Sequence, residues 1–120
     1  MKNIEIISIP VNDPEKAKEF YVHILGFVIV FEGQSPEGKW LQLALPGDKV
    51  SVSLVSGPRH APAGSVKGTI IATDDIEHDV RILSEKGVKI PGINEFPHGM
   101  IATFNDPDGN QWVLRQAPKF

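Results

Sequence analysis

The amino-acid sequence repeats one pattern of structural signals. Residues 4–31 begin with an apolar segment, continue with an acidic helix start and a helical pattern, and end with glycine and a second apolar segment. Residues 66–94 follow the same order at an offset of about 62 residues, roughly half of the chain. Because a unit of this size is too small to bury a core alone, the two units must pack together. A ligand cleft between two related sheets is the natural result.

Composition and charge restrict the class of protein. The net charge is −3 and no basic stripe occurs, which argues against a nucleic-acid partner. No apolar run approaches the roughly 20 residues that span a membrane, and the N-terminus reaches an acidic turn too early for a secretory signal. Cysteine is absent, which excludes disulfides, zinc-thiolate sites and thiol catalysis. We therefore expect a cytoplasmic protein without a membrane partner.

Each repeat contains a helix whose two ends are marked. Asp13 is the predicted N-cap of the first helix, Pro14 occupies its first helical position, and Gly26 ends it. Asp75 and Gly87 have the same roles in the second repeat. Both helices carry one apolar stripe, so each is expected to cover one face of a sheet.

Short apolar runs between turn residues predict the strands. After the opening strand, the first half has runs at 27–32, 40–45 and 50–55, and the second half has strands at 68–73, 88–93, 100–104 and 111–116. Each half is therefore β-α-β-β-β, and the short turns favour antiparallel pairing of its last strands. We predict an α+β fold in which two βαβββ modules form cupped mixed sheets with one helix on the outer face of each.

The two modules are expected to form a single domain of residues 1–120. Module one covers about 1–56, a linker rich in Gly and Pro covers about 57–66, and module two covers about 67–120.

Three motifs resemble those of one superfamily. Asp13-Pro14, Phe20-Tyr21 and Leu25-Gly26-Phe27 resemble the first-module signature of the vicinal oxygen chelate superfamily, and residues 74–88 resemble its second module. The segment NDPDGN at 105–110 resembles its closing turn. The superfamily includes glyoxalase I, fosfomycin-resistance enzymes, extradiol dioxygenases, methylmalonyl-CoA epimerase and bleomycin-resistance proteins. The resemblance covers essentially the whole chain and implies the glyoxalase-like fold, but that fold hosts many chemistries.

The resemblance also implies where a metal would be held. Metal-using members bind the ion through His and Glu side chains, and their positions correspond here to Ile6, Gly68, Val113 and one of residues 51–53. Ile, Gly and Val donate no side-chain electron pair to a transition metal. We therefore expect no metal and no other cofactor, which argues against the usual glyoxalase, fosfomycin-transferase and ring-cleaving dioxygenase reactions.

Polar candidates for the cleft are few. His98 directly precedes a strand that should line the cleft, and it is a candidate ligand contact or general acid/base. Surface positions are expected for His23, His60 and His78. Arg115 should share a strand face with Val113, either holding an anionic ligand group or lying in solvent.

Two tryptophans complete the predicted site and core. Trp40 is either a stacking wall for a flat ligand or ordinary packing, and Trp112 is expected in the core beneath the second helix. The predicted cleft lining is Ile6, Ser8, Trp40, Ser53, Gly68, His98, Met100, Val113 and Arg115.

Three functions remain open at this point. We favour a metal-independent binding protein of the bleomycin-resistance kind, which holds a small planar or amphipathic molecule in a cleft at a dimer interface. The alternative is a glyoxalase-family enzyme of lyase, isomerase or dioxygenase type, with an atypical metal site or with His98 as acid/base. A regulatory or structural dimer with a vestigial pocket is the third. A homodimer is expected in each case, and the linker leaves open whether subunits exchange modules.

Overall fold

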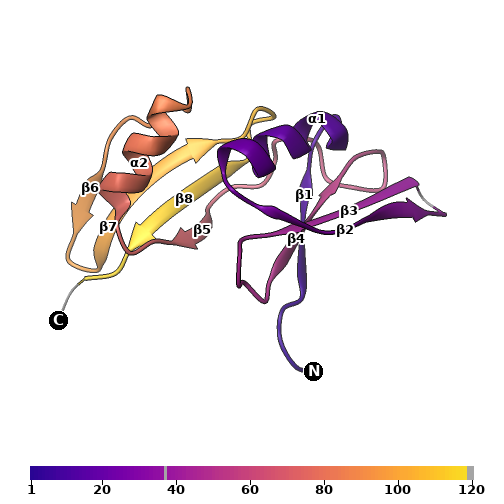
Figure 1. Cartoon of the computed structure of the whole chain (residues 1–120), viewed down its shortest axis with the longest axis horizontal. Helices are drawn as coiled ribbons and strands as arrows, with labels where there is room; N and C mark the ends of the chain where they lie inside the picture. Colours follow the sequence, from indigo (N-terminus) through magenta and orange to yellow (C-terminus); the bar gives the residue numbers. More distant parts are fainter. Residues whose placement is uncertain (37, 119–120) are drawn as a thin grey trace.

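Two four-stranded sheets, each accompanied by one helical segment, make up the chain (Figure 1). The computed structural model describes residues 1–36 and 38–118. The first module contains β1 (Ile6–Pro10), α1 (Pro14–Glu19), η1 (Phe20–Ile24), β2 (Val28–Ser35), β3 (Gly38–Ala44) and β4 (Ser51–Val55). The second contains β5 (Thr69–Ala72), α2 (Ile76–Glu85), β6 (Asn94–Phe96), β7 (Gly99–Asn105) and β8 (Gln111–Gln116). The predicted α+β fold of two βαβββ modules is confirmed.

The two sheets share one topology. Their strand orders are β1-β4-β3-β2 and β5-β8-β7-β6. In each sheet the first strand pairs in parallel with the last, and the other pairs are antiparallel, as the short turns predict. The internal repeat of the sequence is therefore a structural repeat.

The first helix begins as predicted but changes type. The Asp13 carboxylate accepts hydrogen bonds from the backbone N–H groups of Glu15 and Lys16. From Phe20 the chain continues as the π-helical segment η1, in which the neighbouring side chains of Phe20 and Tyr21 are both buried. Gly26, at φ +83°, ends the segment.

The second helix also follows its end signals. The Asp75 side chain caps the backbone N–H of His78, and Gly87 at φ +92° follows the helix. Ile76 and Leu83 are its buried contacts with the sheet. Neither helix in the described part of the chain is long and apolar enough to cross a membrane.

The strand predicted at 88–93 is wrong. This segment is irregular, with Val88, Ile90 and Ile93 packed against the core, and the edge strand β6 begins only at Asn94. Pro91 has no N–H to donate to a sheet, and Gly92 adopts φ +154°, so the apolar run is interrupted.

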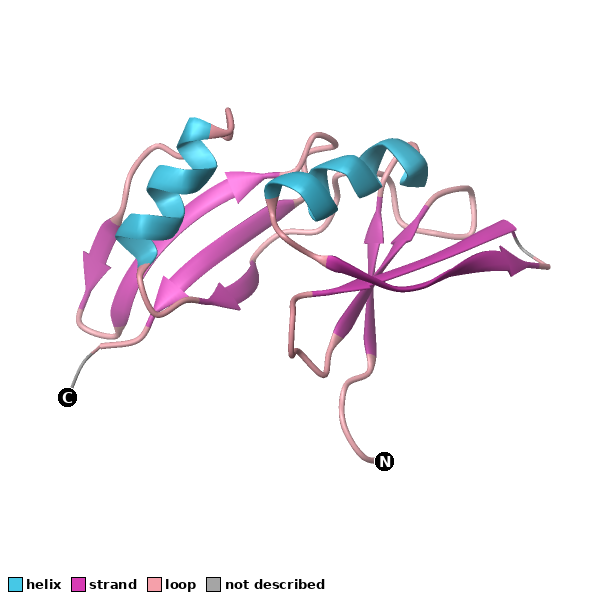
Figure 2. Ribbon diagram, in the orientation of Figure 1, coloured by secondary structure: helices cyan, strands magenta, loops and turns pink. Residues whose placement is uncertain are grey.

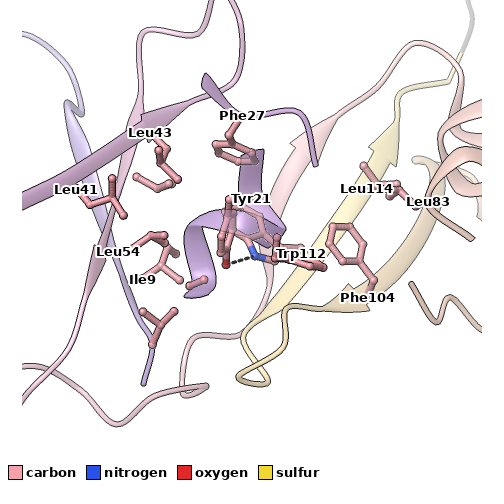
Figure 3. Close-up of a cluster of buried hydrophobic side chains, with 14 of the residues drawn as sticks. Ile9, Tyr21, Phe27, Leu41, Leu43, Leu54, Leu83, Phe104, Trp112 and Leu114 are labelled. Atoms are coloured by element: carbon pink, nitrogen blue, oxygen red, sulfur yellow. Dashed lines mark hydrogen bonds between the residues drawn. The ribbon is translucent and has the colours of Figure 1, made fainter. Parts of the chain in front are cut away.

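The modules share one hydrophobic core through their helix-covered faces. Tyr21 and Phe27 of module one pack edge-to-face against Trp112 of module two, with ring centroids 5.9 and 6.0 Å from the indole (Figure 3). Trp112 is only 2% exposed, as expected of a core residue, but its ring contacts lie in the first module rather than beneath the second helix. Both helices consequently lie along the same side of the molecule (Figure 2).

A buried polar network crosses this boundary between the modules. The Tyr21 hydroxyl donates to Asp106 Oδ2 at 2.6 Å and accepts from Trp112 Nε1 at 3.1 Å. Asn110 Nδ2 donates to the Pro10 carbonyl and to Asp106 Oδ2, each at 2.8 Å. We call Tyr21, Asp106, Asn110 and Trp112 the inter-module network. Burial, and next the hydrogen bond to Asp106, raise the pKa of the Tyr21 phenol far above its ordinary value.

The closing turn supplies half of this network and also fixes the linker. Asp106 Oδ1 accepts from the backbone N–H groups of Asp108 and Asn110, which shapes the turn. Gly109 adopts φ +98°, the positive value that the DPDG sequence predicts. At the end of the linker, the Gly64 N–H donates to the Pro10 carbonyl at 3.2 Å. A Cβ added to Gly64 would lie 2.1 Å from the backbone carbonyl oxygen of Asp108, so the linker approaches the closing turn closely there.

Replacing Tyr21 with Phe tests the inter-module network. The change keeps the ring but leaves the buried Trp112 Nε1 without an acceptor and removes one of the two side-chain hydrogen bonds to Asp106 Oδ2. We therefore expect the free energy of unfolding to fall by about 2 kcal/mol. Urea unfolding measures this. The exposed Asn12 side chain, which donates to Asp108 between the same modules, provides the control, since Asn12→Ala should change stability by less than about 0.5 kcal/mol.

A second readout of the same pair is the pH dependence. Above pH ~10 the unfolded chain ionises Tyr21 while the folded chain keeps the proton, so the unfolded state binds fewer protons and stability falls as the pH rises. The stability gap between wild type and Tyr21→Phe should therefore narrow above pH ~10. A constant gap, or no loss of stability in the variant, would contradict the network.

Replacing Gly109 with Val tests the closing turn. A β-branched residue is strained at φ +98°, so we expect a loss of roughly 2 kcal/mol and a lower melting temperature. Asn105→Val, at an exposed position of β7 just before the turn, is the matched control and should be nearly neutral. An unchanged melting temperature for Gly109→Val would show that the turn is wrongly assigned.

Candidate functional site

Each sheet has one face that its helix does not cover. On β4, Val52 and Leu54 are buried in the core, so Ser51 and Ser53 point to the opposite side. The residues that pair with Ser51 and Ser53 on the neighbouring strands lie on the same side of the sheet. We call it the first open face, and its side chains are Ile6, Ser8, Val28, Phe31, Trp40, Gln42, Ala44, Ser51 and Ser53.

The first open face has small side chains in the middle and large apolar side chains at its edge. Its central positions carry small side chains, Ser51, Ser53 and Ala44, which are at most 6% exposed. At the edge, Val28 and Phe31 on β2 are 48% and 53% exposed. Large exposed apolar side chains around a small-residue floor are typical of ligand or partner contact.

Two aromatic side chains belong to this face. The Phe31 ring lies across Gly33, because a Cβ added to Gly33 would be 3.0 Å from Phe31 Cε2 and Cζ. Gly33 pairs with Trp40 on β3, and Trp40 Nε1 donates to Gln42 Oε1 at 3.2 Å. Trp40 is half-buried. Sequence reasoning missed Phe31, because the bulge between Ile29 and Phe31 shifts the alternation along β2. Gln42 has the spacing that puts it on the strand face of Trp40, but the predicted cleft did not include it.

The second open face belongs to β5, β7 and β8. Trp112 and Leu114 are in the core, so Val113 and Arg115 take the opposite side with their cross-strand partners. We define this face by Ile70, Ala72, Ile101, Thr103, Gln111, Val113 and Arg115. It is mainly apolar, and Ile70 is 60% exposed.

Arg115 and His98 lie at one end of the second open face. Arg115 Nη2 donates to the backbone carbonyl of His98 at 2.6 Å, which ties β8 to the β6–β7 hairpin. The His98 ring is exposed and stacks on Phe96, with centroids 5.2 Å apart. In the described part of the chain no carboxylate is hydrogen-bonded to this imidazole. An acid/base role for His98 stays a prediction.

The placement of Met100 in the cleft is wrong. Met100 pairs with Gln116, whose Oε1 accepts from the Ile76 N–H at the start of α2, so both side chains lie on the helix-covered face. Met100 packs against the core. Because Ala102 and Phe104 of β7 are in the core, alternation gives Ile101 and Thr103, not Met100, to the open face.

The positions that would hold a metal in relatives do not fit one here. Ile6 and Val113 are apolar, and Gly68 has φ +81°, where any side chain is strained. Among residues 1–36 and 38–118, no three His, Asp or Glu side chains are grouped so as to hold an ion. The donor set therefore does not match a transition metal.

The predicted cleft residues fall into two groups within one chain. Ile6, Ser8, Trp40 and Ser53 belong to the first sheet, whereas Val113 and Arg115 belong to the second. Trp40 and Ser53 line a cavity of about 240 Å³ that His60 of the linker also lines. One chain thus presents two separate open faces on a shared, helix-covered core.

Comparison with known proteins decides the family. The sequence profile of the Glyoxalase/Bleomycin resistance protein/Dioxygenase superfamily matches residues 3–114. The chain belongs to this superfamily. The resemblance drawn from its motifs is confirmed, and so is the glyoxalase-like fold.

Several known proteins are similar to this chain over nearly their whole length. TnmS3, an antibiotic binding protein from Streptomyces sp. CB03234, is 39% identical, with a TM-score of 0.94 and 98% of both chains covered. A superfamily member from Sphaerobacter thermophilus is 31% identical, with a TM-score of 0.89 over 97% of this chain and 98% of that one. YetH of Bacillus subtilis, an uncharacterized protein, is 31% identical over 97% of this chain and 99% of its own.

Proposed function

We propose that this superfamily member binds a small, flat, largely apolar molecule between its open faces and releases it unchanged. The observation that carries this proposal is the exposure of large apolar side chains on those faces, above all Ile70 at 60% and Phe31 at 53%. Removing such apolar surface from water lowers the free energy, so a bound molecule or a second subunit would be stabilised there. Trp40 and Phe31 offer a flat ligand two aromatic side chains on one face of the first sheet.

The comparisons support a binding role. TnmS3, described as antibiotic binding, shares 39% of its residues and nearly the whole fold. The metal positions of this chain carry Ile6, Gly68 and Val113, which suit apolar contact better than Lewis-acid chemistry. We therefore propose an antibiotic-like ligand, without a metal.

We further propose that the working form is a homodimer. The chain is elongated, with a radius of gyration of 14.9 Å against about 13.6 Å expected for a compact domain of this length. Its two open faces lie on separate sheets, and each exposes apolar side chains. A two-fold pair would set the first open face of one subunit against the second open face of the other, and so form two equal clefts.

Tryptophan fluorescence tests the binding role. The chain has two tryptophans: Trp40 is half-buried on the first open face and Trp112 is buried in the core. Titration with a panel of flat polycyclic compounds should quench Trp40. The variant Trp40→Phe, which keeps Trp112, should show little quenching. Mass spectrometry of the recovered compound should find it unchanged.

Two results would overturn this proposal. One is a ligand recovered with altered mass, which would favour the enzyme alternative. The other is stabilisation and quenching by no compound in the panel, which would favour a structural role.

A charge on the second open face tests the dimer. We expect Ile70→Asp to yield monomers by light scattering and to weaken ligand binding at least about tenfold, because a carboxylate is costly to bury in an apolar interface. Ser84→Asp, at an exposed position of α2, is the control and should remain dimeric. A dimeric Ile70→Asp variant with full binding would contradict the proposed arrangement.

A further inference from the structure

Ser53 carries a buried hydroxyl without a partner. Its side chain is 1% exposed, and its Oγ has no hydrogen bond within residues 1–36 and 38–118. Folded proteins pair nearly all buried polar groups, because an unpaired one loses its bonds to water and gains nothing in return. An unpaired hydroxyl beside a cavity is therefore a feature that a bound molecule would complete.

The hydroxyl lies in a polar row across the first open face. Ser53 pairs with Ser8 on β1 and with Gln42 on β3, and Gln42 pairs with Phe31 on β2. The row therefore runs from two serines through an amide to an aromatic ring. Ser53 also lines the cavity of about 240 Å³, together with Trp40.

The row is biased towards donating hydrogen bonds. An indole N–H can only donate, so the Gln42 atom that faces Trp40 Nε1 at 3.2 Å must be the amide oxygen. This contact occupies the acceptor of Gln42 and leaves its NH₂ group as a donor. The Ser53 hydroxyl beside it adds a second donor. The atom that suits two donors on one row is an oxygen that only accepts, such as a carbonyl.

The surroundings of the row define the rest of the ligand. Phe31, lying across Gly33, and Trp40 provide aromatic surface next to the donors. A flat ring system places its faces against such side chains and its carbonyl oxygen in its own plane.

We infer that Ser53 and Gln42 select flat aromatic ligands that carry a carbonyl oxygen. This inference rests on the proposed binding function and adds the chemical class of the ligand. Ser53 is the specificity-determining residue, and Trp40 positions Gln42.

A matched pair of compounds tests the inference. 9-Fluorenone and fluorene have the same tricyclic skeleton, but only 9-fluorenone carries a carbonyl. Wild type should bind 9-fluorenone about tenfold more tightly than fluorene, the effect of one good hydrogen bond. Ser53→Ala should lose most of this preference while binding fluorene as wild type does. Ser84→Ala, at an exposed position of α2 outside both open faces, should keep the preference.

The unliganded protein provides a second measurement. Because the Ser53 hydroxyl has no partner to lose, Ser53→Ala should melt at the wild-type temperature or above it. A clearly lower melting temperature would show that the hydroxyl is paired within the protein, and would overturn the inference. Equal binding of the two compounds by wild type would also overturn it and leave the binding function intact. Binding of neither compound would overturn both.

Discussion

The hydrogen bond between the Tyr21 hydroxyl and the Asp106 carboxylate links the two halves of this protein at the centre of their common core. Asp106 serves two structures at once. One oxygen of its carboxylate shapes the closing turn through backbone N–H groups, and the other receives Tyr21 and Asn110. The carboxylate that shapes the turn between β7 and β8 therefore also joins the two modules. Around them, Phe27 and Trp112 exclude water, which strengthens each bond in the network.

This mode of joining explains the open faces. The modules pair through the sides that carry helices, so the opposite side of each sheet is left without a neighbour within the chain. The first open face combines a polar row with aromatic surface, whereas the second is apolar with one cation, Arg115. The two faces of one chain thus offer different chemistry to a molecule or to a second subunit. The superfamily fold fixes where these faces lie, and the residues on them decide what they can recognise.

Much of the fold was predictable because its signals are local. The capping residues Asp13 and Asp75, the glycines after both helices, and the positive φ of Gly109 each follow from the chemistry of one or two neighbouring residues. Errors arose where a local signal competes with register. The apolar run at 88–93 has the composition of a strand, but Pro91 and Gly92 interrupt it in the structure.

The candidate site was less predictable, since a shift of one residue exchanges the faces of a strand. Met100 was misplaced because the face of each β7 residue depends on its register with β8, and Phe31 was missed because of the bulge in β2. The partner of Tyr21 could not be read from the sequence at all, because Asp106 is 85 positions away. Neither could the unpaired state of Ser53, which depends on side chains from three strands.

The shared aromatic cluster also makes the two halves one cooperative unit. If module two detached, Tyr21 and Phe27 would lose their contact with Trp112 and become exposed to water. The Trp112 indole of module two would become exposed as well, because Tyr21 and Phe27 cover it. Unfolding of one module therefore removes the packing that stabilises the other module. The slowest-exchanging amides of both sheets should consequently exchange through the same global unfolding event. The two repeats of the sequence therefore share one free energy of unfolding, because their core is common. Each repeat keeps the outline of a module, but the core that would let it fold alone is divided between them.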